Sequence, residues 1–237
     1  MQIDSNTVVL VLGATGNLGQ ACAQAFRDLG AHTILADRSD DRLQERYGDW
    51  DSAQHMLVGG VDLTDEGAAS DLIARIVERF GRVDAVINTV GAFRGGQPVH
   101  TEPLDTWRFL LEVNLMAALI ISRAVIPVML SQGHGRIVHI ASQNAFRGAA
   151  NYAAYGAAKA ALLRLSESLA DEVKAHGINV NCVVPGTMDT PDNRRAMPDT
   201  DTSDWVSPAA VANVIAFLAS AEADAVTGAA VPVSGRG

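Results

Sequence analysis

Hydrophobic residues along the chain follow two spacings, and the alternation of these spacings predicts strands and helices in turn. The run 7–12 is β-branched and aliphatic throughout, which is typical of a strand buried on both faces of a parallel sheet. The segment 65–80 instead repeats apolar residues one helical turn apart, as at Leu72, Ile73 and Ile76, and therefore predicts an amphipathic helix. On the same reasoning we expect strands at 7–12, 32–36, 55–58, 83–87, 135–141, 178–184 and 229–233. Helices are expected at 21–29, 40–47, 65–80, 104–130, 152–175 and 208–219.

Strands that alternate with helices predict an α/β fold, in which a parallel seven-stranded sheet has helices on both faces as a three-layer α/β/α arrangement. A length of 237 residues suits a single domain spanning 1–237. The segment 187–207 is polar, contains proline and has no periodicity, so we interpret it as a lid.

Composition narrows the class of protein. Hydrophobic residues make up 48% and charged residues 19%, which is typical of a globular chain. A net charge of −9 without a basic run argues against nucleic acid and anionic membranes as partners. The apolar stretch 115–130 is interrupted by polar residues and is too short to span a bilayer, and residues 1–5 do not resemble a secretory signal. Two core-type cysteines, Cys22 and Cys182, fit a cytoplasmic location.

Metal ligands are not grouped along the sequence. The six histidines show no pairwise helical spacing and have no neighbouring cluster of cysteines or carboxylates. We therefore expect no metal site.

A glycine-rich loop, residues 13–19, stands between the first strand and the first helix. Gly13 permits a tight turn, Gly16 lets the backbone approach a pyrophosphate at the helix N-terminus, and Gly19 lets helix and strand pack closely. A plain strand-to-helix turn is the alternative, but the strand–loop–helix context favours a dinucleotide site. The fold class is accordingly a Rossmann-type, doubly wound sheet.

The second strand ends in Asp37 and Arg38, about 20 residues beyond the glycine loop. A carboxylate at this position suits the ribose 2′-OH and favours NAD. A guanidinium at the same place suits a 2′-phosphate, so NADP stays open.

Further candidates follow the later strands. Asp62 is placed to bind an adenine edge or, alternatively, to begin a helix; Gly91 leaves room for a flat cofactor; and the exposed loop 92–103 suits a substrate mouth. Asn114 lies inside an apolar helical run and needs a partner. It is either a satisfied core amide or the mark of a backbone distortion that places a water near Lys159.

The chemistry centres on Tyr155 and Lys159, which lie one turn apart on a predicted helix. An ammonium beside a phenol favours the phenolate and is expected to lower the tyrosine pKa toward neutrality. Such a tyrosine exchanges protons with a carbonyl or alcohol oxygen. Ser142, at the carboxyl end of a strand, is placed to hold that oxygen.

Taken in order and spacing, these features resemble the short-chain dehydrogenases/reductases from end to end. The resemblance implies Tyr155 as general acid/base, Ser142 as orienter of the substrate oxygen, Lys159 as ligand of the nicotinamide ribose and Asn114 as anchor of a relay water. The cofactor contacts that it implies are Gly13, Thr15, Gly16, Asn17, Leu18, Gly19, Asp37, Arg38, Asp62, Leu63, Asn88, Gly91, Tyr155, Lys159, Pro185, Gly186, Thr187 and Thr190.

The sequence departs from the family pattern in the phosphate loop, where Leu12 and Asn17 replace the usual threonine and middle glycine, and at 88–91, a relaxed Asn-Asn-Ala-Gly. The lid 187–198 resembles that of the dihydropteridine reductases. Those enzymes are similar to a branch with alanine at the position of Ser142, so the lid is either a shared architecture or a sign of a pteridine substrate.

The sequence thus predicts an NAD(P)(H)-dependent enzyme that interconverts a secondary alcohol and a ketone by hydride transfer, with NAD preferred. The alternatives are an NADH-dependent dihydropteridine reductase and a dinucleotide-binding sensor without chemistry. The family resemblance also implies a homo-oligomer, a tetramer or dimer, that uses the helices at 104–130 and 152–175.

Overall fold

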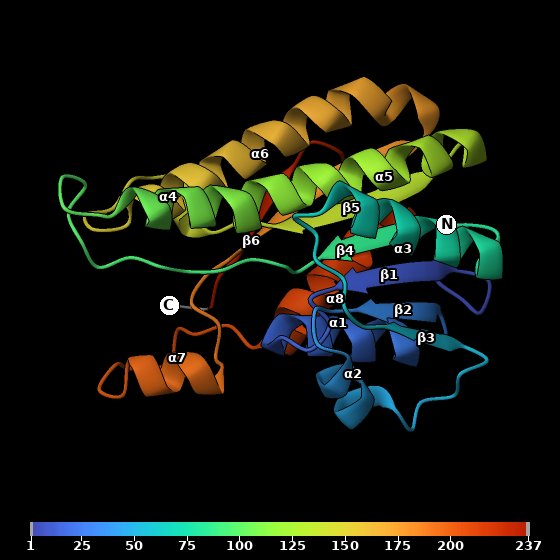
Figure 1. Ribbon diagram of the computed structural model, residues 1–237, viewed down its shortest axis with the longest axis horizontal. Helices are drawn as coiled ribbons and strands as arrows, with labels where there is room; N and C mark the ends of the chain where they lie inside the picture. Colours follow the sequence, from blue (N-terminus) through green and yellow to red (C-terminus); the bar gives the residue numbers. More distant parts are fainter. Residues whose placement is uncertain (1, 236–237) are drawn as a thin grey trace.

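A parallel sheet forms the middle layer of the computed structural model, which describes residues 2–235 (Figure 1). Its seven strands are in the spatial order β3-β2-β1-β4-β5-β6-β7, and every neighbouring pair is parallel. The predicted fold class is confirmed. The strands are β1 Val8–Leu12, β2 His32–Ala36, β3 His55–Val58, β4 Ala85–Asn88, β5 Gly135–Ile140, β6 Ile178–Pro185 and β7 Ala230–Val233.

Helices cover both faces of the sheet (Figure 1). One layer contains α1 Asn17–Asp28, α2 Asp40–Tyr47 and α8 Pro208–Ala219. The other contains α3 Glu66–Phe80, α4 Leu104–Leu111, α5 Ala117–Gln132 and α6 Ala153–Val173. The short helix α7, Pro191–Ala196, lies away from the sheet (Figure 1).

The central strand β1 shows why the chain forms this sandwich. All five of its residues are buried, and successive side chains point to opposite faces. Val8, Leu10 and Leu12 pack with α3 and α5, whereas Val9 and Val11 pack with α1 and α8. Each fully buried aliphatic side chain contributes about 1.5–3 kcal/mol, so a strand buried on both sides fixes both helical layers.

The helical run Leu104–Gln132 is long and apolar enough to cross a membrane, by length and composition alone. The sequence-based expectation that no segment is long enough to span a bilayer considered only the apolar stretch 115–130, not the whole helical run. In the fold, α5 packs against α3 and β5 and contributes buried residues to the main core, as a core helix of a globular domain does.

The lid is more regular than expected, because it contains α7 and a parallel bridge between Met188 and Val206. Thr190 caps α7 by accepting a hydrogen bond of 3.2 Å from the N–H of Asn193. A six-residue helix is too short to show hydrophobic periodicity, so the sequence pattern missed it.

Candidate active site

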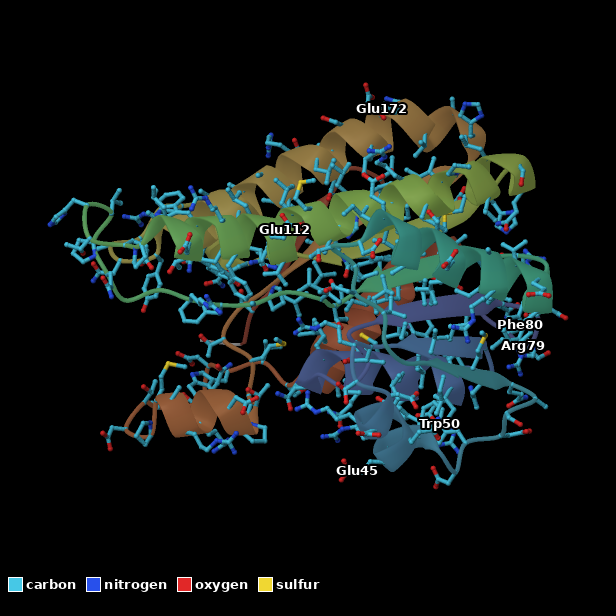
Figure 2. The ribbon with its side chains drawn as sticks, viewed as in Figure 1. Glu45, Trp50, Arg79, Phe80, Glu112 and Glu172 are labelled. Atoms are coloured by element: carbon cyan, nitrogen blue, oxygen red, sulfur yellow. The ribbon has the colours of Figure 1, made fainter. Side chains whose placement is uncertain are left out.

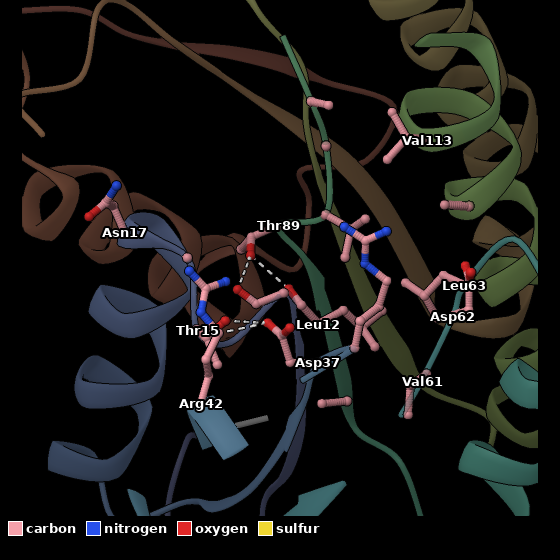
Figure 3. Close-up of a pocket in the computed structure, with 18 of the residues that line it drawn as sticks. Leu12, Thr15, Asn17, Asp37, Arg42, Val61, Asp62, Leu63, Thr89 and Val113 are labelled. Atoms are coloured by element: carbon pink, nitrogen blue, oxygen red, sulfur yellow. Dashed lines mark hydrogen bonds between the residues drawn. The ribbon is translucent and has the colours of Figure 1, made fainter. Parts of the chain in front are cut away.

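The sheet reverses its strand order between β1 and β4, and a cavity of about 720 Å³ opens at the carboxyl ends of these strands (Figure 3). Such a reversal point is where open α/β sheets bind ligands. Half of the predicted cofactor contacts line this cavity: Gly13, Thr15, Gly16, Asn17, Asp37, Arg38, Asp62, Leu63 and Gly91.

The glycine loop is shaped by close backbone packing. Gly13 has φ +71°, and a Cβ on Gly19 would lie 2.1 Å from the carbonyl oxygen of Gly13, so no side chain fits there. Helix α1 begins with no side-chain cap within the described chain, which leaves its first N–H groups available to an anion. Thr89 Oγ1 donates 2.6 Å to the Leu12 carbonyl and ties the end of β4 to the loop (Figure 3).

Asp37 and Thr15 bind each other inside the cavity (Figure 3). Asp37 Oδ2 accepts from the N–H of Thr15 at 3.1 Å and from its hydroxyl at 2.8 Å. Asp37 Oδ1 has only a 3.3 Å bond from the N–H of Ser39, so it keeps acceptor capacity toward the cavity. The Thr15 hydroxyl therefore fixes the carboxylate that was predicted to bind the ribose.

Asp62 lies across the cavity from the glycine loop (Figure 3). The N–H of Thr64, and then its hydroxyl, donate to Oδ1 and lower the pKa of Asp62 below its usual value. The alternative that Asp62 begins α3 is wrong, because Asp65 caps that helix by accepting from the N–H groups of Gly67 and Ala68. Its contact with adenine stays a prediction.

Ser142 and Tyr155 come together as predicted, from the end of β5 and the first turn of α6. Burial raises the pKa of Tyr155, and the neighbouring Ser142 hydroxyl partly offsets this by lowering it. Both side chains are partly accessible, so a ligand can reach the hydroxyl pair. The arrangement brings a proton donor, Tyr155, next to a hydroxyl that can bind the substrate oxygen, Ser142.

Lys159 does not act on Tyr155 as the sequence suggested. Its ammonium lies 5.9 Å from the centroid of the Tyr155 ring and donates 2.8 Å to the Ile140 carbonyl. Burial lowers the pKa of Lys159 to about 8, and Lys159 is not among the causes that shift the pKa of Tyr155. The expected acidification of the phenol is therefore wrong for this arrangement, because burial outweighs the distant, carbonyl-bound ammonium.

Asn114 is a satisfied core amide and also lies at a backbone distortion, while the water near Lys159 stays a prediction. Its Nδ2 donates to the carbonyls of Ala92 at 2.9 Å and Leu110 at 3.0 Å, so it is a satisfied core amide. It also lies in a π-helical turn, Glu112–Met116, which is the expected backbone distortion. A Cβ on Gly91 would lie 2.9 Å from Asn114 Oδ1 and 3.2 Å from Lys159 Nζ, so a small residue there lets these groups converge.

Comparison with known proteins agrees with this geometry. The family description "short chain dehydrogenase" matches residues 7–201. The chain belongs to the short-chain dehydrogenase family. It is therefore an oxidoreductase that acts on CH–OH or C=O groups, and the predicted resemblance is confirmed.

Three relatives match this short-chain dehydrogenase over 96% or more of its length. The 3-oxoacyl-[acyl-carrier-protein] reductase FabG of Escherichia coli is 33% identical over 96% of each chain. A subunit of (2S)-[(R)-hydroxy(phenyl)methyl]succinyl-CoA dehydrogenase, BbsD of Thauera aromatica, is 30% identical over 97% of this chain and 96% of its own. A crystal structure of a short-chain dehydrogenase/reductase from Burkholderia xenovorans is 34% identical, with a TM-score of 0.87 over 99% of this chain and 96% of that one.

Other predicted cofactor contacts of this short-chain dehydrogenase are placed behind or beside the cavity. Leu18 packs in the core between α1 and the sheet. The hydroxyl of Thr190 caps α7. Gly186 donates its N–H to Val233, whereas Thr187 accepts from Val206 through its carbonyl. Their roles toward a cofactor stay predictions, as does that of Pro185, the last residue of β6.

Asn88, His139 and Ser122 form a buried chain of polar groups that the sequence did not reveal. His139 Nδ1 lies 3.3 Å from Asn88 Nδ2, and its Nε2 lies 3.2 Å from Ser122 Oγ. Because Asn88 faces it with an N–H donor and Ser122 gives its proton to the Ala118 carbonyl, the neutral tautomer protonated at Nε2 satisfies both contacts. Burial, and then the charge of Lys159, lower the pKa of His139 to about 4.

The sequence also missed several residues of the cavity wall. Glu112 lines the cavity from the helical layer opposite to α2, the helix that carries Glu45 (Figure 2). Arg42 and Arg46 had a visible signal, because they lie one turn apart on the exposed face of α2, but the contributions of the π-turn and α7 depend on tertiary packing. The residues missed include Gln20, Arg42, Arg46, Thr64, Thr89, Phe109, Glu112, Val113, Asp192 and Arg195.

Proposed function

We propose that this protein is an NAD-preferring dehydrogenase/reductase that interconverts a secondary alcohol and a ketone. The observation that carries the proposal is that the Ser142 and Tyr155 hydroxyls come together in a fold whose strand reversal opens a dinucleotide-type cavity. The names of the Escherichia coli and Thauera aromatica relatives support the reaction class, because one denotes a 3-oxoacyl compound and the other a hydroxy compound.

The residues of the cavity fit a nicotinamide dinucleotide. The glycine loop has no room for a Cβ at Gly19 and offers the uncapped start of α1 to a pyrophosphate. Asp37 Oδ1 supports NAD, because a carboxylate accepts a hydrogen bond from a ribose hydroxyl and repels a 2′-phosphate. Arg38 and Arg42 line the same wall and are the groups through which NADP would be held.

Tyr155 gives its phenolic proton to the ketone oxygen during reduction and takes it back during oxidation. Ser142 holds that oxygen next to the phenol. Bound NAD(H) supplies the hydride. Lys159, fixed by the Ile140 carbonyl, would hold the nicotinamide ribose, and Asn114 holds the loop at Ala92.

We further propose that the protein is a cytoplasmic homo-oligomer that associates through the α4–α5 and α6 helices. Less than half of the most apolar 18-residue stretch of Leu104–Gln132 is buried within the chain, 44%. Leu111 and Leu130 are exposed along it, and a second copy of the helix pair would cover them. The relatives' names support action on small molecules, as expected for this family.

Oxidation of NADH and NADPH over a panel of ketones tests the proposal. Tyr155→Phe removes only the reacting hydroxyl, and Tyr152→Phe is the matched control on the same helix start. We expect Tyr155→Phe to lose at least a hundredfold in kcat, because general acid catalysis contributes about 10²–10⁴. An unchanged rate would overturn the mechanism. Turnover of quinonoid dihydropteridine that survives Ser142→Ala would favour the pteridine interpretation instead.

A further inference from the structure

Exposed apolar side chains gather on the two loops that flank Tyr155. Nine large hydrophobic side chains are exposed within the described residues 2–235, and five of them come from the segments 92–104 and 143–152. They are Phe93, Val99, Leu104, Phe146 and Tyr152. Phe93 lies directly beside Tyr155 and Tyr152 lies beside Phe93, and exposed apolar side chains at such a place are more typical of a ligand surface than of a solvent face.

Phe93 is in direct contact with the reacting tyrosine. Its ring meets that of Tyr155 edge-to-face, with centroids 5.1 Å apart and an interplanar angle of 83°. A second, tilted contact joins it to Tyr152 at 5.6 Å. Despite these two contacts, 60% of Phe93 stays exposed, so part of the ring is open next to the Tyr155 phenol.

The position of Phe93 is fixed from both sides. Its neighbour Ala92 exchanges two hydrogen bonds with Asn114, and Gly96 donates 2.8 Å to the Asn151 carbonyl. Gly95 fits against Tyr152 so closely that a Cβ there would lie 2.5 Å from its ring. The ring is therefore presented in a preorganised position, which lowers the entropic cost of binding.

The chemistry around the ring is apolar. The guanidinium of the charged neighbour Arg94 stacks over Phe109, a residue of the cavity wall, at 3.6 Å from the ring centroid. The Tyr155 ring that meets Phe93 carries a hydroxyl close to that of Ser142, and two hydroxyls together suit a single ligand oxygen. A ligand held by this arrangement has one carbonyl and a flat apolar group next to it.

We propose that Phe93 determines substrate specificity and that the substrate is a ketone, or the corresponding alcohol, with an aromatic ring next to the reacting carbon. This rests on the proposed function, since it assigns the substrate class of the same site. The substrate ring packs against the exposed part of Phe93 while its carbonyl oxygen meets Tyr155 and Ser142. Aromatic pairs favour such contacts beyond area burial, by an amount that corresponds to roughly twofold to tenfold in affinity.

Acetophenone and cyclohexyl methyl ketone test the proposal, because they differ mainly in whether the ring is flat. We expect the wild-type enzyme to prefer acetophenone in kcat/KM by roughly threefold to tenfold. Phe93→Leu should abolish the preference, chiefly by raising the KM for acetophenone. Phe93→Tyr, which keeps an aromatic ring, should retain it. Phe217→Leu makes the same change at an exposed phenylalanine on α8 and should leave the preference intact.

Binding measurements separate this inference from the proposed function. Both ketones are titrated into NAD-loaded Tyr155→Phe protein, with and without Phe93→Leu, and the shift in Tm is followed. A Phe93-dependent preference for acetophenone in binding supports the inference even if no ketone is turned over. The absence of turnover would contradict only the proposed function. Equal shifts in Tm with the two ketones when Phe93 is present, or a preference that survives Phe93→Leu, would overturn the inference.

Discussion

The carboxamide of Asn17 donates a hydrogen bond of 3.2 Å to Asp192 Oδ2, and this contact joins the glycine loop to the lid helix α7. Both residues line the cavity. Asp192 also pairs with Arg195 on the same helix. The lid thus presents a carboxylate to the part of the loop where a dinucleotide would place its pyrophosphate.

Asp192→Ala should tighten dinucleotide binding, because it removes a negative charge next to the pyrophosphate position and releases Asn17. The pair is exposed, so the expected gain is modest, roughly twofold to fivefold in Kd, and should shrink as salt is raised. Fluorescence titration with NADH measures it. Asp189→Ala, which removes another lid carboxylate that is paired with Arg194, is the control and should change little.

Asp37→Asn should shift nucleotide preference toward NADP. The amide keeps an acceptor for Thr15 but loses the charge that repels a 2′-phosphate, so kcat/KM for NADPH relative to NADH should rise roughly tenfold, or about 1.4 kcal/mol. Steady-state kinetics with both nucleotides measures the ratio. Thr15→Val removes the hydroxyl contact without changing charge, and a ratio that moves equally in this variant would contradict the electrostatic explanation.

The direction of the reaction should depend on pH through Tyr155. Because burial raises the pKa of this phenol, the proton donor needed for ketone reduction is present throughout the neutral range. Alcohol oxidation needs the phenolate, so its kcat should rise steadily on the alkaline side while reduction falls. Initial rates in both directions between pH 6 and 10 check this. An oxidation rate that is flat with pH would show that another group accepts the proton.

His139 should make the fold sensitive to mild acid. Its pKa is about 4 in the fold against 6.5 in the unfolded chain, so protons bind the unfolded state preferentially below pH 6.5. The resulting stability is complete above pH 6.5 and is lost progressively down to pH 4, by about 3 kcal/mol. Urea unfolding of His139→Asn should show a flatter curve across this window. His176→Asn, at an exposed position, should follow the wild type.

Much of the architecture could be predicted because it follows from local pattern. The run at 7–12 is buried on both faces, as its composition indicated, and helix α3 ends at Gly81, whose φ is +74°. The meeting of Ser142 with Tyr155 also follows from a strand end beside a helix start. These features depend on chain periodicity and on the geometry of parallel sheets.

The rest depends on contacts between distant segments, which no local pattern contains. Lys159 is bound by the Ile140 carbonyl, 19 residues away, and this reversed the expected effect on Tyr155. Thr15 and Asp37 were predicted as separate cofactor contacts, and their mutual hydrogen bonds appear only when β1 and β2 lie side by side. The neutrality of His139 likewise needs both of its partners in place.

The π-helical turn at Glu112–Met116 has a consequence for engineering. Each residue of an α-helix advances about 100° around the axis, so the extra residue in this turn sets α4 and α5 at a different rotational offset from a straight helix. Leu110 thereby faces α6 near Tyr155, while Ile121 faces the sheet. Deleting a single residue between 112 and 116 would convert the turn to a regular α-helix and rotate Ser122 away from His139. The number of residues in this turn is therefore as constrained as their identity.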